Sequence, residues 1–165
     1  MATTRELVSA RYGTDIGVGD EAEATGTIAG LLSHRSIRLY EDRPVEDDLI
    51  DVLLACAQSA PCKSNLQQYS IVVVQDKATR EKLAPFVPRT KSLPTVPALL
   101  VFCADMRRGQ RVTGFRGKQH CNNNMDTFLN ATIDASLAMG FFVAAAEAAG
   151  LGCAPLSSLR DYMYQ

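Results

Sequence analysis

Residues 34–45 read His-Arg-Ser-Ile-Arg-Leu-Tyr-Glu-Asp-Arg-Pro-Val, and residues 60–74 read Ala-Pro-Cys-Lys-Ser-Asn-Leu-Gln-Gln-Tyr-Ser-Ile-Val-Val-Val. The first stretch begins with a histidine, two arginines and a serine, whose guanidinium and hydroxyl groups can bind a phosphate. The second places small and amide side chains directly before a β-branched run typical of a strand. Taken singly, the first also fits a solvated basic turn, and the second fits an ordinary polar connection between a helix and a strand.

Hydrophobic patterning around these stretches indicates alternating helices and strands. A short helix is predicted over residues 28–34, and a longer one starts after Pro44 and ends at Pro61. The run 70–74 is a predicted strand, and residues 79–86 are a second short helix with Thr79 as its cap.

The second half of the chain continues the alternation. The continuous apolar run 98–104 predicts a strand buried on both faces, and the polar, basic segment 105–123 predicts a mobile, irregular excursion. The longest helix is predicted over residues 125–149 and is apolar nearly all round, so we expect it to be buried and partly covered by a second subunit. A short strand is predicted over residues 153–156. The pattern is that of a layered α/β (α+β) domain.

Composition places the chain among ordinary globular proteins. Its 165 residues, 47% hydrophobic and 21% charged, suit one domain, which we assign to residues 28–165 after a flexible N-terminal arm over residues 1–27. A net charge of −1 gives no indication of a nucleic-acid partner, which would require a basic surface. No apolar run approaches the roughly 20 residues that a membrane-spanning helix needs, so we expect no membrane partner. Five scattered cysteines without a C-x-x-C pair predict a reducing, cytoplasmic setting, and two histidines exclude a histidine-rich metal site.

In this order and spacing, the two stretches resemble the nitroreductase family, in particular its NADPH-dependent nitroreductase and FMN-reductase branch. The end of the long helix, Ala-Glu-Ala-Ala-Gly-Leu-Gly-Cys over residues 146–153, is similar to the family's A-E-x-L-G-L-G stretch. The resemblance covers residues 28–160. It implies a nitroreductase-like fold, with a central mixed sheet flanked by helices and a long buried central helix. It also implies that the usual C-terminal third is missing.

The same resemblance implies FMN as the cofactor and NAD(P)H as the co-substrate. Hydride would pass to nitroaromatics, quinones or flavins in a ping-pong cycle, without a catalytic side chain, because the cofactor carries the reaction. In such relatives the residues at positions 34–36 hold the FMN phosphate, Arg38 lies near the pyrimidine edge, and residues 61–65 reach the flavin from the partner in a homodimer. The implied cofactor-binding residues are His34, Arg35, Ser36, Arg38, Pro61, Cys62, Lys63, Ser64, Asn65, Gln67, Leu156, Ser157, Ser158 and Arg160.

Departures from the family pattern keep other interpretations open. Cys62-Lys63 and Ser157-Ser158 replace serine and glycine pairs, and with the early end they favour a truncated domain with weak or no flavin binding and an interaction or vestigial role. Cys62 beside Lys63 also fits a redox thiol. The remaining candidates are a metal pair at His120-Cys121 and a site for the 2′-phosphate of NADPH in residues 107–118. For these two the ordinary polar loop is the preferred interpretation.

Overall fold

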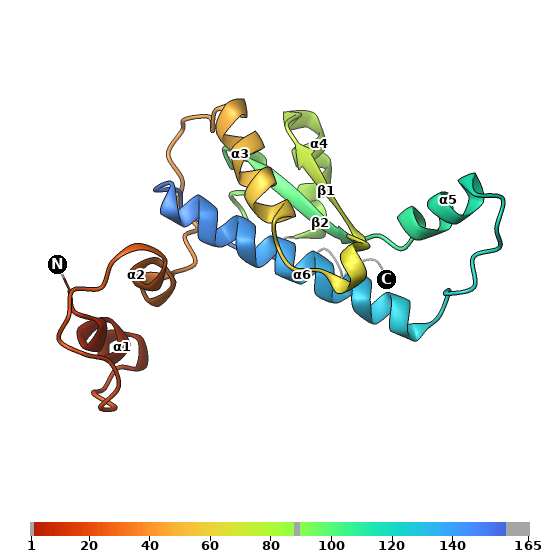
Figure 1. The fold of residues 1–165 in the computed structure, drawn as a ribbon. Coiled ribbons are helices and arrows are strands. Elements are labelled where there is room, and N and C mark those ends of the chain that lie inside the picture. Colours follow the sequence, from red (N-terminus) through yellow and green to blue (C-terminus); the bar gives the residue numbers. More distant parts are fainter. Residues whose placement is uncertain (1, 88–89, 158–165) are drawn as a thin grey trace. The chain divides into compact units, whose positions relative to one another are not determined.

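The computed structural model of the chain describes residues 2–87 and 90–157 (Figure 1). The chain divides into two compact units. The first contains Met1–Arg38 and Val143–Pro155, and the second contains residues 39–142. The long helix α6 (Met125–Ala148) therefore contributes residues to both units.

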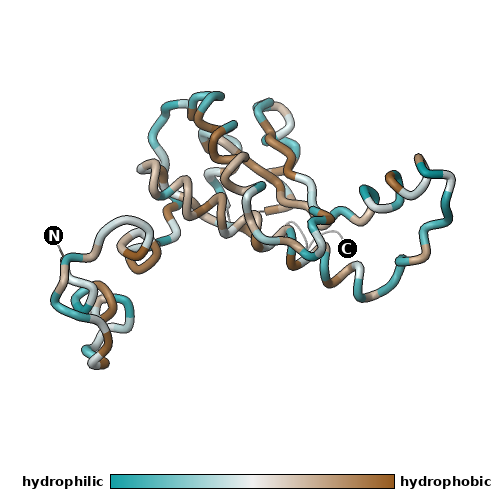
Figure 2. The backbone as a smooth tube through the Cα atoms, in the orientation of Figure 1, coloured by the Kyte–Doolittle hydropathy of each residue, from teal (hydrophilic) through white to brown (hydrophobic). Residues whose placement is uncertain are grey.

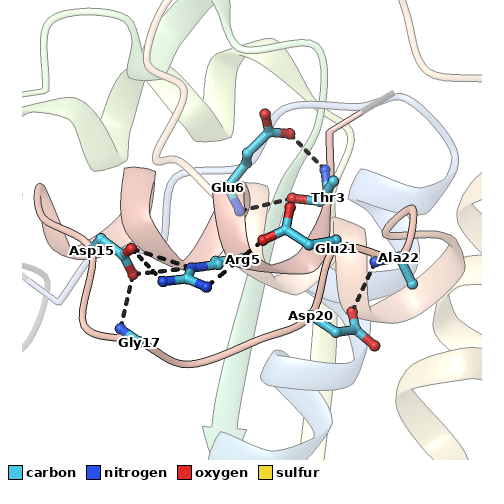
Figure 3. Close-up of polar contacts among 8 residues, drawn as sticks. All are labelled: Thr3, Arg5, Glu6, Asp15, Gly17, Asp20, Glu21 and Ala22. Atoms are coloured by element: carbon cyan, nitrogen blue, oxygen red, sulfur yellow. Dashed lines mark hydrogen bonds and ion pairs between the residues drawn. The ribbon is translucent and has the colours of Figure 1, made fainter.

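The first unit begins with a helix that the sequence analysis did not predict. Helix α1 (Thr4–Tyr12) starts with a capping box, in which Thr3 and Glu6 exchange side-chain and backbone hydrogen bonds, and it ends at Gly13 with φ 74°. Arg5 ties it to the following turn by binding Asp15 at 2.7 Å (Figure 3). Helix α2 (Gly26–Ser33) follows, as predicted, and ends immediately before residues 34–38, the predicted phosphate-binding residues, which we call the phosphate motif.

The second unit is built on two strands, both of which were predicted. Strand β1 (Tyr69–Val74) pairs antiparallel with β2 (Leu99–Ala104), in a register that places Tyr69 opposite Ala104 and Val74 opposite Leu99. Within the described residues the sheet has these two strands only, so the expected mixed sheet is not found there. Strand β2 is half-exposed rather than buried on both faces.

The expected strand over residues 153–156 is also absent from the described part of the chain. These residues are irregular, and one backbone bond of 2.9 Å, from the Ile37 N–H to the Cys153 carbonyl, joins them to the phosphate motif. A single bond of this kind does not make a ladder.

Helices α3, α4 and α5 precede, separate and follow the two strands along the chain, and two predictions about them are corrected. Helix α3 (Asp47–Gln58) lies where predicted, but α4 (Lys77–Leu83) is capped by Asp76, which accepts from the N–H groups of residues 78 and 79, rather than by Thr79. Short 3₁₀ turns cover Lys63–Asn65, Ala84–Phe86 and Leu93–Thr95. Helix α5 (Arg107–Phe115) takes up part of the predicted irregular segment 105–123, and residues 118–123 are irregular as predicted. The Asp105 carboxylate accepts the Arg107 N–H at the start of α5.

Helix α6 packs one side on the sheet. Its Ala135 and Ala138 form a core with Tyr69, and Phe142 meets Phe102 edge-on, with ring centroids 5.7 Å apart. Figure 2 shows hydrophobic colours along both strands, along helices α2 and α3, and, more lightly, along α6. The opposite side carries an apolar stripe at every fourth residue, which we call the outer stripe: Met125, Leu129, Ile133, Leu137 and Phe141. The single chain therefore leaves this side of α6 exposed, and its expected cover by a second subunit stays a prediction.

Helix α6 is also long and apolar enough to cross a membrane by length and composition, the one such helix among the described residues. This corrects the expectation that no apolar run approaches that length. The core helix of a soluble domain passes the same test. Here Asp134, within α6, is 2% exposed and accepts hydrogen bonds from backbone N–H groups of the second unit, so this side of α6 packs on protein.

Candidate functional site

The phosphate motif begins at the residue that ends α2. His34 leaves the helix with extended backbone angles, φ −48° and ψ 131°, and its Nδ1 lies 2.6 Å from Oε1 of Glu147 on α6. A carboxylate in this position fixes the orientation of the imidazole. Sequence reasoning placed Glu147 only in a family stretch and missed this role. The sequence feature that could have indicated this role is that Glu147 is a single acidic residue in an otherwise apolar helical turn.

The side chains that follow His34 face solvent. Arg35, Ser36 and Arg38 are exposed, and Arg35 donates from Nη1 to the His34 carbonyl at 2.7 Å. Within the residues that the structure describes, Ser36 and Arg38 make no side-chain hydrogen bond or ion pair. The motif thus presents two guanidinium groups and a hydroxyl with unused donors, as an anion site requires.

Ile37 holds the motif against the turn after α6. Besides its backbone bond to Cys153, its side chain packs on Gly152, where an added Cβ would lie 2.7 Å from the Ile37 Cβ. The absence of a side chain at Gly152 is therefore required for this contact. Burial, followed by the charge of Glu147, raises the pKa of the nearby Cys153 thiol, which keeps that thiol protonated.

The second predicted segment has an unusual backbone. Ser64, Asn65 and Gln67 all have positive φ, at 53°, 54° and 48°. Non-glycine residues in this region are uncommon and cost on the order of 1 kcal/mol each, so three within four residues need support from their surroundings. Such concentrated strain is typical of binding sites.

A buried carboxylate supplies that support. Asp134 accepts the Lys63 N–H at 3.3 Å through Oδ1 and the Gln68 N–H at 3.1 Å through Oδ2. The two bonds bracket residues 63–68, which we call the anchored loop. Sequence reasoning missed Asp134, although one acid inside an apolar helix was a signal that its charge needed partners.

The other contacts of the anchored loop are at the surface. Lys63 pairs with Asp126 of α6 at 3.2 Å, and the amide of Gln67 lies 3.4 Å from Asn65 Oδ1. The side chains of Lys63 and Asp126 are 52% and 66% exposed, so this ion pair contributes little stability. Asp126 and Asp134 lie eight positions apart on one side of α6, and both hold the loop.

The remaining predicted site residues divide into two groups. Pro61 is exposed and Cys62 is half-buried just before the anchored loop, and Leu156 and Ser157 are exposed in irregular chain after α6. Ser158 and Arg160 lie outside the described residues. The phosphate motif belongs to the first compact unit and the anchored loop to the second.

The competing sites gain no support from the geometry. The Lys63 ammonium pairs with Asp126 at 3.2 Å, and the Cys62 Sγ lies 3.9 Å from an acceptor, Asn65 Oδ1. His120 Nδ1 lies 3.3 Å from the Thr113 hydroxyl, and no group of three potential metal ligands occurs in the described part of the chain. Arg108 reaches Gln67 Oε1 at 3.5 Å, which brings the basic helix α5 to the anchored loop.

Comparison with known proteins decides the lineage. The model of the Nitroreductase family matches residues 31–163. The chain belongs to the nitroreductase family. It is 35% identical to the FMN reductase (NAD(P)H) of Bacillus subtilis over 81% of its own length and 54% of that protein, and 31% identical to the oxygen-insensitive NADPH nitroreductase of Salmonella typhimurium over 82% and 55%.

Solved structures agree on the fold of this nitroreductase-family chain. The NfrA1 structure from B. megaterium is similar with a TM-score of 0.78 and 36% identity, over 81% of this chain and 55% of that one. The NADPH:FMN oxidoreductase of Vibrio harveyi, complexed with NAD+, is similar with a TM-score of 0.74 and 29% identity, over 82% of this chain and 57% of that one. The nitroreductase-like fold is therefore confirmed, and the chain spans about half the length of the curated relatives it matches.

Proposed function

We propose that the chain forms the FMN-binding part of an NAD(P)H-dependent oxidoreductase of the nitroreductase family. The observation that carries this proposal is the phosphate motif, where exposed donors of Arg35, Ser36 and Arg38 stand beside a histidine fixed by Glu147. Relatives of similar sequence are named FMN reductase and NADPH nitroreductase. When bound there, FMN would supply the transfer of electrons from NAD(P)H to a nitroaromatic, quinone or flavin in a ping-pong cycle.

The residues present fit this cofactor. His34, Arg35 and Ser36 bind the phosphate, for which bidentate guanidinium and hydroxyl donors are suited. Arg38 would lie at the pyrimidine edge, where a cation would stabilise negative charge on the flavin ring. Ser64 and Asn65 of the anchored loop, in left-handed conformations, would present polar groups to the flavin ring of the partner subunit in a homodimer. No side chain is assigned to proton transfer.

We further propose that a second copy of the chain covers the outer stripe of α6, which makes the protein a homodimer. Ile133 and Phe141 of this stripe are 45% and 42% exposed, and apolar side chains in such a row mark an interaction surface. Sedimentation velocity should show a dimer, and Ile133→Glu at the centre of the stripe should produce monomers. A monomeric wild-type chain over the micromolar range would contradict this. The five free cysteines support a cytoplasmic setting.

The visible spectrum of the purified chain, with and without added FMN, tests the main proposal. We expect a flavin spectrum that bleaches under NADPH. Arg35→Ala should weaken FMN binding by about tenfold to a hundredfold, which is the loss expected for a charge-assisted hydrogen bond. Arg38→Ala should mainly lower the reduction potential of the flavin. The control is Arg43→Ala, since Arg43 is an exposed arginine that contacts only Glu41, at 3.8 Å, among the described residues.

Two results of these measurements would contradict the proposal or its site assignment. A colourless protein that takes up no added FMN would contradict the proposal and favour the alternative of a nitroreductase-fold interaction domain. Unchanged FMN binding in Arg35→Ala would show that the phosphate site is assigned to the wrong residues.

A further inference from the structure

Two guanidinium groups meet at one backbone carbonyl in the first unit. The His34 carbonyl accepts from Arg35 Nη1 at 2.7 Å and also from Arg11 Nη1 at 2.6 Å. Both arginine side chains are exposed. Each guanidinium has five N–H donors, so most donors of both remain unused after this contact.

The local charges are unbalanced. Within the described residues neither Arg11 nor Arg35 pairs with a carboxylate, and Glu147, the acid of this cluster, is bound by His34 at 2.6 Å. Arg5 on the same helix differs, because Asp15 and Glu21 neutralise it (Figure 3). Two cations held at one carbonyl repel each other, and a bound anion would relieve that repulsion.

Helix α1 holds Arg11 in place through its own contacts. The capping box fixes the start of the helix, and backbone N–H groups of Thr4 and Arg5 bond to the carbonyls of Ala22 and Asp20 at 3.1 Å each. Arg11 occupies the last turn of α1, before Gly13. Residues 1–30 precede the part of the chain that matches the family model, so Arg11 lies outside the matched pattern.

We propose that Arg11 is a further phosphate-binding residue, by which the N-terminal segment adds a guanidinium to the site formed by His34, Arg35 and Ser36. The inference rests on the proposed function, because the phosphate is that of FMN. It assigns a binding role to a segment that composition alone marks as an arm. The group that Arg11 would bind is the phosphate monoester of FMN. Riboflavin lacks this phosphate and so offers no anion to Arg11.

Paired titrations of the full chain with FMN and with riboflavin test this inference. Arg11→Ala should weaken FMN binding by about tenfold or more while leaving riboflavin affinity unchanged, because only FMN carries the phosphate. Arg11→Lys should recover part of the loss by keeping the charge without the planar fork. Arg43→Ala serves as the control for removal of one positive charge and should bind both ligands like the wild type.

Three outcomes separate the possible failures. A wild-type chain that binds neither flavin overturns the proposed function and this inference with it. If Arg35→Ala weakens FMN binding and Arg11→Ala does not, the inference alone is wrong. An equal loss of FMN and riboflavin affinity in Arg11→Ala means a structural role and also overturns it. If circular dichroism shows that Arg11→Ala loses helix content, the Arg11→Lys variant replaces it in the test. The same comparison of FMN affinity with riboflavin affinity then decides the inference.

Discussion

Replacing Asp134 with asparagine tests how the anchored loop is held. The carboxylate is 2% exposed and accepts two backbone N–H groups, from Lys63 and Gln68, at either end of the strained backbone. Asparagine has nearly the same shape but one acceptor oxygen. It can satisfy one of the two N–H groups, while its amide nitrogen faces the other, donor to donor.

The distances set the size of the effect. At 3.3 and 3.1 Å the bonds are longer than the roughly 2.7–2.9 Å of strong charge-assisted hydrogen bonds, so each is worth about 1.5 kcal/mol, the low end for such bonds. Asp134→Asn should therefore lower the free energy of unfolding by about 1.5 kcal/mol, and Asp134→Ala by about 3 kcal/mol. Domains of this size have about 5–15 kcal/mol in total, so both losses are measurable.

Urea denaturation followed by circular dichroism, at one protein concentration, measures these values. The matched control is Asp126→Asn, the same substitution two turns earlier on α6, which breaks an exposed pair at 3.2 Å and should cost less than about 1 kcal/mol. FMN affinity should fall in Asp134→Asn, since the loop relaxes from its left-handed geometry. Equal stability of the two asparagine variants would refute the argument that Asp134 anchors the loop.

Two further predictions concern other contacts. Gly152→Ala should destabilise the chain by about 1–3 kcal/mol in the same assay, because the new Cβ overlaps the Ile37 side chain near its root, and a neutral result would mean that this contact yields easily. Hydrogen bonds from the Ser70 hydroxyl and the Arg107 N–H lower the pKa of Asp105. The ionised carboxylate therefore stabilises the fold at pH values above its unfolded pKa of about 3.9. This stabilisation is lost as the pH falls through the pKa of the folded state. Ser70→Ala should thus be less stable than the wild type at neutral pH, with the difference disappearing in acid; a difference that does not vary with pH would contradict this assignment.

Sequence patterning predicts the elements whose residues are fixed by burial. The β-branched run at 70–74, the apolar run at 98–104 and the apolar segment 125–149 each become the expected strand or helix, because hydrophobic periodicity reports directly on packing. The residue spacing of positions 34–38 and 61–67 also predicts the family, which the comparisons confirm.

Patterning fails where polar contacts or backbone geometry decide. Helix α1 carries a capping-box signature in Thr3 and Glu6, but its glycine-rich surroundings hid it. Helix α5 contains three arginines and two glycines in nine residues, a composition that favoured an irregular segment. The predicted strand at 153–156 lacks a ladder partner among the described residues. No rule of composition could show that Asp134 would bind the backbone of a loop 66 residues earlier.

The three left-handed residues of the anchored loop limit which variants of this loop can be engineered. Saturation libraries at Ser64, Asn65 and Gln67 would consist mostly of damaged proteins, since β-branched and aromatic residues tolerate φ near 50° poorly. Glycine and asparagine are the substitutions compatible with the backbone there, although glycine removes the side chain that would touch a ligand. Diversity is better introduced at Pro61 or Cys62, just before the strained residues, where the chain has ordinary extended geometry at Cys62.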